Sequence, residues 1–248
     1  MRGTLIICTD LESLSREAAA RFAAVVAACV GERGLARVAL AGGATPRRLY
    51  ELLASEELRA SVPWAQVHFF WGDERLVPLD HPESNYRMAR ETLLKHLALP
   101  KENVHPVPVA STAEAAALAY EQELRQHFRQ RRGPPAFDLI LLGLGADGHT
   151  ASLFPRAAAL AEKERLVAAT QSPTSGLPRI TLTLPVLNEA RQIFFLVAGE
   201  NKAAALRLAV EAPGTLPAQL VAPRRGLLTW LVDTAAAGQL HSVKVQAP

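Results

Sequence analysis

The amino-acid sequence predicts an α/β fold in which a doubly wound, mostly parallel sheet is flanked by helices. Short apolar runs alternate along the chain with longer segments of helical pattern. The short runs are apolar on both faces, as in strands that helices cover on both sides. The 248 residues contain no internal repeat, low-complexity tract or linker. We therefore expect one Rossmann-like domain over residues 1–248.

The first elements expected are a strand, a helix and a second strand. Residues 5–8 form a short apolar run that is typical of a strand. Residues 13–32 have a helical pattern, which we expect Ser15 to cap and Gly34 to end. Residues 37–41 are the next apolar run. This order of elements is that of a parallel sheet with crossover helices.

The middle of the chain continues the alternation. Pro46 suits the first turn of a helix, because its missing N–H costs nothing there, and we expect this helix to run to about Ser55. A later helix is expected to begin at Ser84 or Asn85. The elements expected next are, in order, a strand at 66–71, helices at 84–96 and 112–131, and a strand at 137–142.

The last third of the chain supplies the remaining elements. A Thr/Leu-rich stretch at 180–184 precedes a strand at 193–197, a helix at 201–210 and a strand at 227–232. In doubly wound folds, ligands bind beyond the carboxyl ends of the strands. The loops that follow strands are therefore the places to look for a site.

The charge balance argues against nucleic acid as a partner. The net charge is only +3, and the basic residues are scattered. The densest basic run, residues 129–132, lies at the expected end of a helix, where positive charge is favourable. A small anionic substrate needs only a few well-placed cations.

Other compositional features indicate a cytoplasmic protein. Cys8 and Cys29 lie in apolar surroundings without the spacing of a metal site or a disulfide framework. The N-terminus lacks the pattern of a signal peptide, and no apolar run approaches the length of a membrane span. We expect no metal and no membrane partner. Because no interface stripe is evident, we also expect a monomer.

The loop at residues 42–46 (GGATP) is the first candidate for chemistry. Gly42 and Gly43 let the backbone approach a ligand closely, and the start of the following helix can hold an anion. Thr45 adds a hydroxyl donor. A tight turn with Thr45 as the helix cap would give the same pattern, so this loop alone does not show whether a ligand binds here.

The segment 71–75 (WGDER) is the second candidate, since three charged residues follow a strand directly. Arg75 could bind an oxyanion or a phosphate in bidentate fashion. Asp73 could act as a base or accept a sugar hydroxyl. The alternative is an ion-pair cluster at the surface, which contributes little energy.

The segment 143–155 (GLGADGHTASLFP) is the strongest candidate. Its glycines, among them Gly145, imply special backbone angles or a close approach of ligand. Asp147 could accept an N–H of His149 and orient it as a general base. If His149 lies at a helix N-terminus, the helix dipole would keep it neutral near pH 7.

Two further cations deserve mention. Arg179 precedes the Thr/Leu-rich stretch, and Lys202 lies at an expected helix start, where its charge is unfavourable unless an anion binds there. Each could also be an ordinary solvated cation. The sequence contains no nucleophile elbow, so a serine acyl-enzyme is not expected.

Taken together, these motifs resemble the glucosamine-6-phosphate isomerase/6-phosphogluconolactonase family, and within it the 6-phosphogluconolactonases. The resemblance covers residues 37–232, and its most specific part is the string DGHTASLFP. The matching segments are 42–46, 71–75 with Pro78, 83–86, 143–155, 179–183 and 199–202.

The resemblance implies hydrolysis of 6-phosphoglucono-1,5-lactone to 6-phosphogluconate in the oxidative pentose phosphate route, with no cofactor. The substrate would be a small phosphorylated sugar lactone. By resemblance, His149 takes a proton from water, Asp147 orients His149, and Arg75 stabilises the developing negative charge. The remaining expected binders of phosphate and sugar are Gly42, Gly43, Thr45, Asp73, Gly145, Arg179 and Lys202.

Two alternatives remain. Glucosamine-6-phosphate deaminases have a similar Asp-Gly-His loop, but they carry a Glu five residues after the His, where this chain has Phe154. They also usually have Tyr at the position of Arg75. A module that senses a sugar phosphate without turnover is the second alternative, although no helix-turn-helix segment is evident.

Overall fold

A computed structural model describes residues 3–129 and 133–241, and its core is a six-stranded sheet in which every strand is parallel to its neighbours. The strand order is β1-β9-β8-β5-β2-β3. The strands are β1 (Thr4–Cys8), β2 (Ala36–Leu40), β3 (Val67–Trp71), β5 (Leu139–Leu142), β8 (Gln192–Val197) and β9 (Leu227–Asp233). Each of the six predicted strands is found in this sheet, and the expected α/β class is confirmed.

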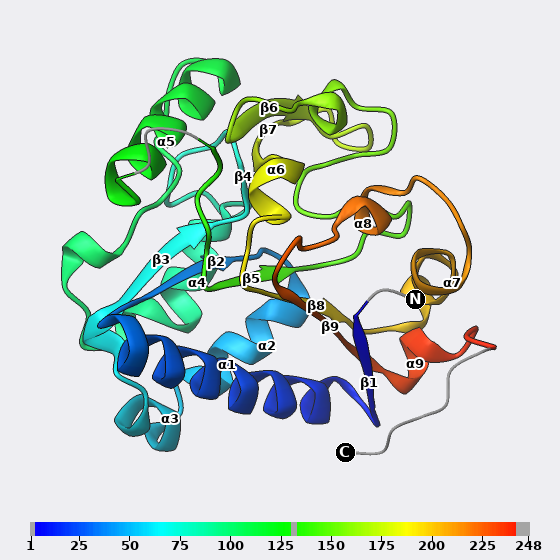
Figure 1. The fold of residues 1–248 in the computed structure, drawn as a ribbon, viewed down its shortest axis with the longest axis horizontal. Helices are drawn as coiled ribbons and strands as arrows, with labels where there is room; N and C mark the ends of the chain where they lie inside the picture. The colour runs from blue at the N-terminus through cyan, green and yellow to red at the C-terminus, as the bar shows by residue number, and fades with distance from the viewer. Residues whose placement is uncertain (1–2, 130–132, 242–248) are drawn as a thin grey trace.

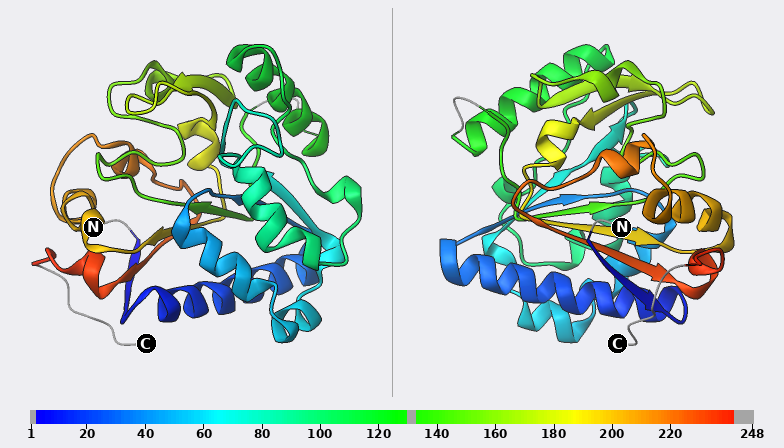
Figure 2. Two further views of the ribbon diagram at one scale, coloured as in Figure 1. Left: turned by 180° about the vertical axis from the view of Figure 1, so that it is seen from behind. Right: turned by 45° about the vertical axis from the view of Figure 1, so that its right-hand side comes forward.

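Helices lie on both sides of this sheet. Figure 1 shows α1, α2 and α3 on one side, and α5, α6 and α8 with a second, smaller sheet on the other. The views in Figure 2 show the same layers. The helices are α1 (Leu11–Arg33), α2 (Ala44–Leu53), α3 (Glu56–Ser61), α4 (Asn85–Thr92), α5 (Ala113–His127), α6 (Leu184–Leu187), α7 (Ala203–Glu211), α8 (Pro217–Leu220) and α9 (Thr234–Ala237).

The strands are apolar because both of their faces are covered. All four residues of β5 are buried, as are five of the six residues of β8. The side chains of this parallel sheet therefore form one continuous core with the helices. Cys8 and Cys29 are both buried and unpaired, as the sequence predicted.

The start of α1 differs from the prediction. Asp10, not Ser15, is the cap, because its carboxylate accepts the backbone N–H of Ser13 at 2.7 Å. Ser15 is buried inside the helix, and its hydroxyl donates to the carbonyl of Leu11. Gly34 ends the helix in the left-handed conformation, as expected.

Two other helices are shorter than predicted. The helix expected at 84–96 begins after its cap Ser84 but ends at Thr92, and a separate 3₁₀ turn covers Leu94–His96. The helix expected at 112–131 ends at His127. The basic run 129–132 therefore begins beyond the helix, and residues 130–132 lie outside the described part of the chain.

A three-stranded antiparallel sheet was not predicted. It has the order β4-β7-β6, built from β4 (Asp73–Arg75), β7 (Pro178–Leu182) and β6 (Val167–Gln171). Only part of β7 was noticed, as a Thr/Leu-rich stretch. This sheet matters because β4 and β7 carry three of the candidate site residues, Asp73, Arg75 and Arg179.

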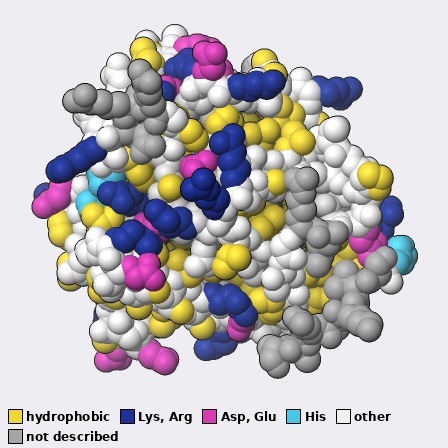
Figure 3. Space-filling model, in the orientation of Figure 1, with side chains coloured by type: hydrophobic (Ala, Val, Ile, Leu, Met, Phe, Trp, Pro, Cys, Tyr) yellow, Lys and Arg dark blue, Asp and Glu magenta, His cyan; other side chains and the backbone are white. Residues whose placement is uncertain are grey.

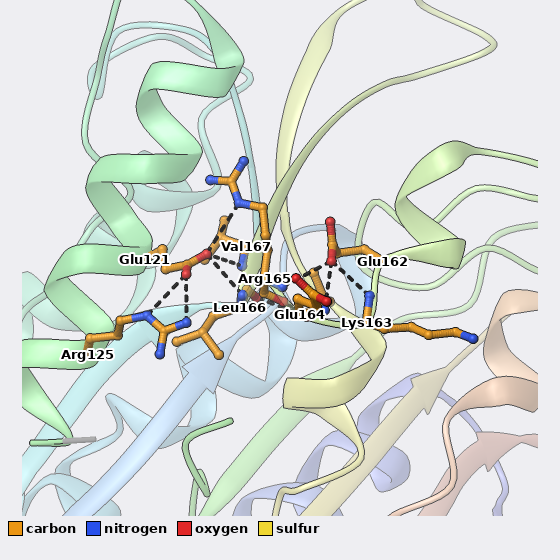
Figure 4. Close-up of polar contacts among 9 residues, drawn as sticks. Glu121, Arg125, Glu162, Lys163, Glu164, Arg165, Leu166 and Val167 are labelled. Atoms are coloured by element: carbon orange, nitrogen blue, oxygen red, sulfur yellow. Dashed lines mark hydrogen bonds and ion pairs between the residues drawn. The ribbon is translucent and has the colours of Figure 1, made fainter. Parts of the chain in front are cut away.

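A buried carboxylate fastens α5 to this second sheet, as Figure 4 shows. One oxygen of Glu121 accepts from Arg125, and the other accepts the backbone N–H of Leu166 at 3.0 Å, just before β6. The charge of Glu121 is thus compensated where it is buried. Glu162 caps the turn that leads to β6 by accepting the backbone N–H of Lys163 and its two successors.

The strand order places a topological switch point between β2 and β5. From β2 the chain continues outward to β3 at the sheet edge, whereas from β5 it continues in the opposite direction to β8 and β9. The loops that follow β2 and β5 therefore diverge from adjacent strands and leave a crevice between them. These are the loops that contain residues 42–46 and 143–155.

Basic and acidic side chains are intermixed on the face drawn in Figure 3. Its Lys and Arg side chains stand in several groups, the densest left of the centre, with acidic side chains among them. This distribution agrees with the scattered pattern seen in the sequence. None of the helices in the described ranges has the length and apolar character that a membrane span requires.

Candidate active site

A cavity of about 800 Å³ lies at the carboxyl ends of β2 and β5. Its walls come from the loops after these strands, from β4 and β7, and from the segment that precedes α7. All ten residues proposed from the sequence line it, namely Gly42, Gly43, Thr45, Asp73, Arg75, Gly145, Asp147, His149, Arg179 and Lys202. The sequence thus located the cavity, while the role of each residue stays a proposal.

Two buried tyrosines fix the strand ends on which the cavity is built. The hydroxyl of Tyr50 donates to the carbonyl of Ala41 and accepts its N–H, at 2.8 and 3.0 Å. Tyr120 makes the same pair of bonds to Trp71, at 3.1 and 2.8 Å. Ala41 directly follows β2 and Trp71 is the last residue of β3, so each lies where a strand of the central sheet leads into a candidate loop. The hydroxyls satisfy backbone groups that the sheet leaves unpaired at these ends.

The loop after β2 requires both of its glycines. A Cβ atom on Gly42 would lie 1.9 Å from Oδ1 of Asn85, so no other residue fits there. Gly43 has φ of 105° and is the N-cap of α2, where no side chain caps the helix. Thr45 is therefore inside the first turn and is not the cap. The uncapped start of a ten-residue helix faces the cavity and can hold an anion.

The loop after β5 folds on itself and presents His149 beside Asp147. The N–H of Gly145 donates to the carbonyl of His149 at 2.8 Å, and Thr150 donates to the carbonyl of Gly143 at 2.9 Å. Nδ1 of His149 lies 2.5 Å from Oδ1 of Asp147. A carboxylate can only accept, so Nδ1 carries the hydrogen and Nε2 of the neutral ring has the free lone pair.

The carboxylate of Asp147 stays charged in this setting. Partial burial raises its pKa, but the hydrogen bonds from the backbone N–H and the ring of His149 lower it further, so its net pKa is below the usual value. The side chain of His149 is one-third exposed, at 33%. The pair therefore consists of a fixed carboxylate and an imidazole that solvent and ligand can reach.

The condition under which a helix dipole would act on His149 is not met. No α-helix begins after this loop, since the next helical turn is the 3₁₀ segment Ala158–Ala161. A helix dipole therefore does not act on the ring. What contacts it instead is Phe154, whose ring centroid lies 4.8 Å away at 49°. An apolar ring at this place packs against the imidazole and offers it no second carboxylate.

Gly145 is required by the His–Asp pair. A Cβ atom at this position would lie 2.0 Å from Nδ1 of His149 and 2.6 Å from Oδ1 of Asp147. Any side chain at 145 would push the two groups apart. The sequence placed Gly145 among the ligand-binding residues, whereas in the structure it leaves the space that His149 and Asp147 need to contact each other.

We expect Gly145→Ala to lower kcat by about 10²-fold, because a displacement of roughly 1 Å at a reacting group costs that much. Gly143→Ala is the matched control, since a Cβ atom at Gly143 meets nothing within 4 Å. Steady-state rates of both variants, with circular dichroism to show that they fold, test this. Equal rates for the two variants would contradict the assigned role.

The charged residues after β3 are not a surface cluster. Asp73 and Glu74 are both buried. Glu74 accepts the backbone N–H groups of Asn85 and Tyr86, both at 2.8 Å, at the start of α4. Burial raises the pKa of Glu74, and these hydrogen bonds oppose that shift. Glu74 therefore holds α4 in place and is not exposed in the cavity.

Asp73 ties the loop of His149 to the second sheet. Oδ2 of Asp73 accepts from the hydroxyl of Ser152 at 2.6 Å, and Asn85 donates to its backbone carbonyl at 2.9 Å. The backbone N–H of Ser152 in turn donates to Thr181, which lies opposite Asp73 in the β4–β7 pair. These contacts fix the loop that carries the histidine relative to the strands that carry the arginines.

Two arginines lie directly opposite each other in the second sheet. Arg75 on β4 is the register partner of Arg179 on β7. One terminal nitrogen of Arg75 donates to the carbonyl of Glu83, while Nε of each arginine is buried without a partner. Burial lowers the pKa of Arg179, and the charge of Arg75 lowers it further.

Lys202 is a third cation on the cavity wall. It lies in the 3₁₀ turn Glu200–Lys202 directly before α7, rather than inside the first turn of an α-helix. Within residues 3–129 and 133–241, none of Arg75, Arg179 and Lys202 has a carboxylate at ion-pair distance. Three cations that line one cavity without a direct ion pair among the described residues favour an anionic ligand.

Several lining residues were not singled out from the sequence. Asn85 and Ser152 belong to matched segments, yet only their contacts with Gly42 and Asp73 reveal their roles. Asn201, in the matched segment before Lys202, also reaches the cavity. Polar side chains between β6 and β7 reach it as well, and no sequence signal marked them. They are Ser172, Thr174 and Ser175.

Comparison with known proteins finds the same group of enzymes repeatedly. A family model described as glucosamine-6-phosphate isomerases/6-phosphogluconolactonase matches residues 9–230. A 6-phosphogluconolactonase of Synechocystis sp. is 48% identical over 217 residues, which are 86% of this chain and 88% of that protein.

Solved structures give the same result for the fold. The 6-phosphogluconolactonase from Trypanosoma cruzi superposes with a TM-score of 0.86 at 32% identity, over 96% of this chain and 97% of that one. A monomeric glucosamine-6-phosphate deaminase superposes with a TM-score of 0.79 at 22% identity, over 95% and 99% of the two chains. The second likeness concerns the fold alone.

Proposed function

The chain belongs to the family of glucosamine-6-phosphate isomerases and 6-phosphogluconolactonases, and on this basis we propose that it hydrolyses 6-phosphoglucono-1,5-lactone to 6-phosphogluconate with water that His149 activates. It is an enzyme of the oxidative pentose phosphate route. The observation that supports this mechanism best is the His149–Asp147 pair, which shares one cavity with three cations that have no direct ion pair among the described residues.

His149 is the general base. Asp147 holds the hydrogen on Nδ1, so Nε2 can accept a proton from a water molecule in the cavity. The resulting hydroxide adds to the lactone carbonyl carbon. Asp147 is a positioning residue that also stabilises the imidazolium formed in this step.

The charge that develops on the carbonyl oxygen requires a donor. We assign this role to Arg75, whose guanidinium lines the same cavity. The tetrahedral intermediate then collapses by breaking the bond to the ring oxygen, which takes the proton back from Nε2 of His149. The product is the open-chain acid, and the histidine returns to its neutral form.

The phosphate is assigned to the remaining cations of the cavity and to the start of α2. Arg179, Lys202 and the uncapped start of α2 at Gly43 all favour an anion, and Thr45 adds a donor in the first turn. Gly42 and Gly145 keep the walls free of side chains. Asp73 retains acceptor capacity for a sugar hydroxyl, because Ser152 and Asn85 occupy only part of the lone pairs of its carboxylate.

The deaminase alternative lacks a group at the necessary place. Ring opening in that chemistry uses a carboxylate five residues after the histidine, and here Phe154 packs against His149 instead. Phe154 is also nearly buried, at 6% exposed. The site can therefore deliver water to a lactone, but position 154 supplies no carboxylate beside His149 for ring opening.

A structure with bound 6-phosphogluconate tests these assignments. We expect the phosphate within hydrogen-bond distance of Arg179, Lys202 and the amides at Gly43, and the carboxylate near His149 and Arg75. The reverse orientation, with the phosphate beside His149, would overturn the division of roles.

We further propose that residues 1–248 form one domain that acts as a cytoplasmic monomer, without nucleic acid, membrane or cofactor. Among the described residues, four large hydrophobic side chains are exposed, which is too few for an obligate interface. They are Val109, Leu118, Leu208 and Leu227. A sedimentation velocity experiment that gives a dimer at micromolar concentration would contradict this expectation.

A further inference from the structure

Three histidines meet at a place remote from the cavity. His68 lies on β3 at the edge of the central sheet, and His127 is the last residue of α5. His105 follows the bridge between Val104 and Phe69, and its N–H donates to the carbonyl of Phe69 at 2.9 Å. None of the three lines the catalytic cavity. They join the sheet edge to a helix and a loop that lie far apart in the sequence.

The ligand atoms of these histidines are close enough to share one ion. One ring nitrogen from each lies within 4.8 Å of the other two. Nδ1 of His68 and Nε2 of His105 are 3.2 Å apart. Zinc–nitrogen bonds of 2.0–2.1 Å at tetrahedral angles place the nitrogens about 3.3 Å apart. The pair of His68 and His105 already has this spacing, and a nitrogen of His127 lies within 4.8 Å of both.

Glu123 sets the orientation of the His105 ring. Its Nδ1 lies 2.9 Å from a carboxylate oxygen of Glu123, which fixes the hydrogen on Nδ1 and leaves the lone pair of Nε2 directed at His68. The ring also stacks on Phe70 at 4.4 Å and 6°. A carboxylate behind a histidine is the usual outer support of a metal ligand.

One nitrogen of the third ring has no partner. Nε2 of His127 is buried without a hydrogen-bond partner. The ring centroid of His127 lies 4.5 Å from that of His68 and 4.7 Å from that of His105. An ion bound among the three rings would give this nitrogen a partner.

The surrounding charges are mixed. Arg37 is the nearby cation that disfavours a second positive charge, and it stands 4.9 Å from the ring of Phe128. Glu123 and Glu102 supply negative charge near the histidines, which offsets the charge of Arg37. All three histidines are partly exposed rather than buried, so an ion has access to them.

We propose that His68, His105 and His127 form a three-histidine zinc site, with water as the fourth ligand, that clamps the edge strand β3 to α5. Nitrogen ligands in this number are typical of zinc. When the ion binds, the hydrogen of His68 that faces His105 moves to Nε2, so that Nδ1 can donate its lone pair. The site stabilises the fold and takes no part in lactone hydrolysis.

The test is zinc binding by chelator-treated protein, followed by competition with a chromophoric chelator and by thermal melting. We expect one equivalent of zinc to bind and the melting temperature to rise with zinc concentration. His68→Gln and His127→Gln should each lose this equivalent. His96→Gln is the matched control, since His96 is exposed and belongs to a separate 3₁₀ turn.

Further readouts separate the site from zinc that binds elsewhere. His149→Gln should retain the equivalent, which excludes the His149–Asp147 pair as its location. Glu123→Gln should weaken binding by about 10- to 100-fold, because the support of His105 is lost. Cobalt in place of zinc should show the intense visible absorption of a four-coordinate ion.

Circular dichroism shows which variants are folded. If a histidine variant does not fold, the weaker zinc binding expected of Glu123→Gln tests the proposal in its place. The proposal is overturned if a folded His68→Gln or His127→Gln variant still binds the equivalent with unchanged affinity. The proposal is also overturned if the wild-type protein binds no zinc, or if the His149→Gln variant loses the bound equivalent. None of these three results would bear on lactonase activity.

Discussion

Replacing His149 by alanine is expected to lower kcat for lactone hydrolysis by about 10²- to 10⁴-fold, the usual contribution of a general base. His149 is the group in the cavity with a free lone pair directed by a fixed carboxylate. Because the ring is one-third exposed and belongs to a surface loop, its removal should leave the fold intact. The measurement is acid release from fresh lactone, with the spontaneous rate subtracted.

Two controls make this result specific. His96→Ala removes an exposed histidine outside the cavity and should retain the full rate. Added imidazole should restore part of the rate of His149→Ala, since the deleted ring leaves room beside Phe154. A folded His149→Ala variant with the turnover of the wild type would show that the base is elsewhere.

Replacing Arg179 by alanine is expected to raise KM by roughly 10- to 100-fold and to leave kcat nearly unchanged. Loss of a charge-assisted hydrogen bond to phosphate costs about 1.5–3 kcal/mol, and that bond is the same in the ground state and the transition state. Lys202 and the start of α2 remain to hold the phosphate. Steady-state kinetics over a wide range of lactone concentration measure both constants.

The control for this variant is Arg16→Ala, which removes an arginine whose side chain is 68% exposed on α1. It should change neither constant. The stability of Arg179→Ala can even increase, because Arg75 loses a like-charged neighbour in the sheet. An unchanged KM, or a loss confined to kcat, would remove Arg179 from the phosphate site.

The central sheet could be predicted because its strands are uniformly apolar. The run LILL of β5 is wholly buried, and no amphipathic helix would leave such a short unbroken run. The second sheet could not be found in this way. β4 has only the three residues Asp73–Arg75, all charged, and becomes a strand because it pairs with β7. Tertiary pairing, rather than local periodicity, determines such elements.

The location of the site could be predicted, but its inner contacts could not. Loops after parallel strands meet at one edge of a sheet, so motifs far apart in the sequence converge there. The role of Gly145, by contrast, depends on the rings and carboxylates that surround it in space. The assumed helix after His149 was wrong because the chain turns back through Thr150 and Leu153 instead.

The histidine cluster shows the same limit. His68, His105 and His127 lie on a strand, a loop and a helix end, so their spacing in the sequence resembles no metal motif. The sequence therefore predicted no metal site. The proposed zinc site departs from that prediction, and only the packing of α5 against the edge of the sheet brings the three rings together.

The most direct test of the whole account is a pH-stat assay of the wild-type protein with freshly made 6-phosphogluconolactone, run beside glucosamine 6-phosphate. We predict acid release from the lactone that saturates with concentration and exceeds the spontaneous rate, and no ammonia from glucosamine 6-phosphate. Lactone hydrolysis at only the spontaneous rate, or release of ammonia from the amino sugar, would contradict the assignment.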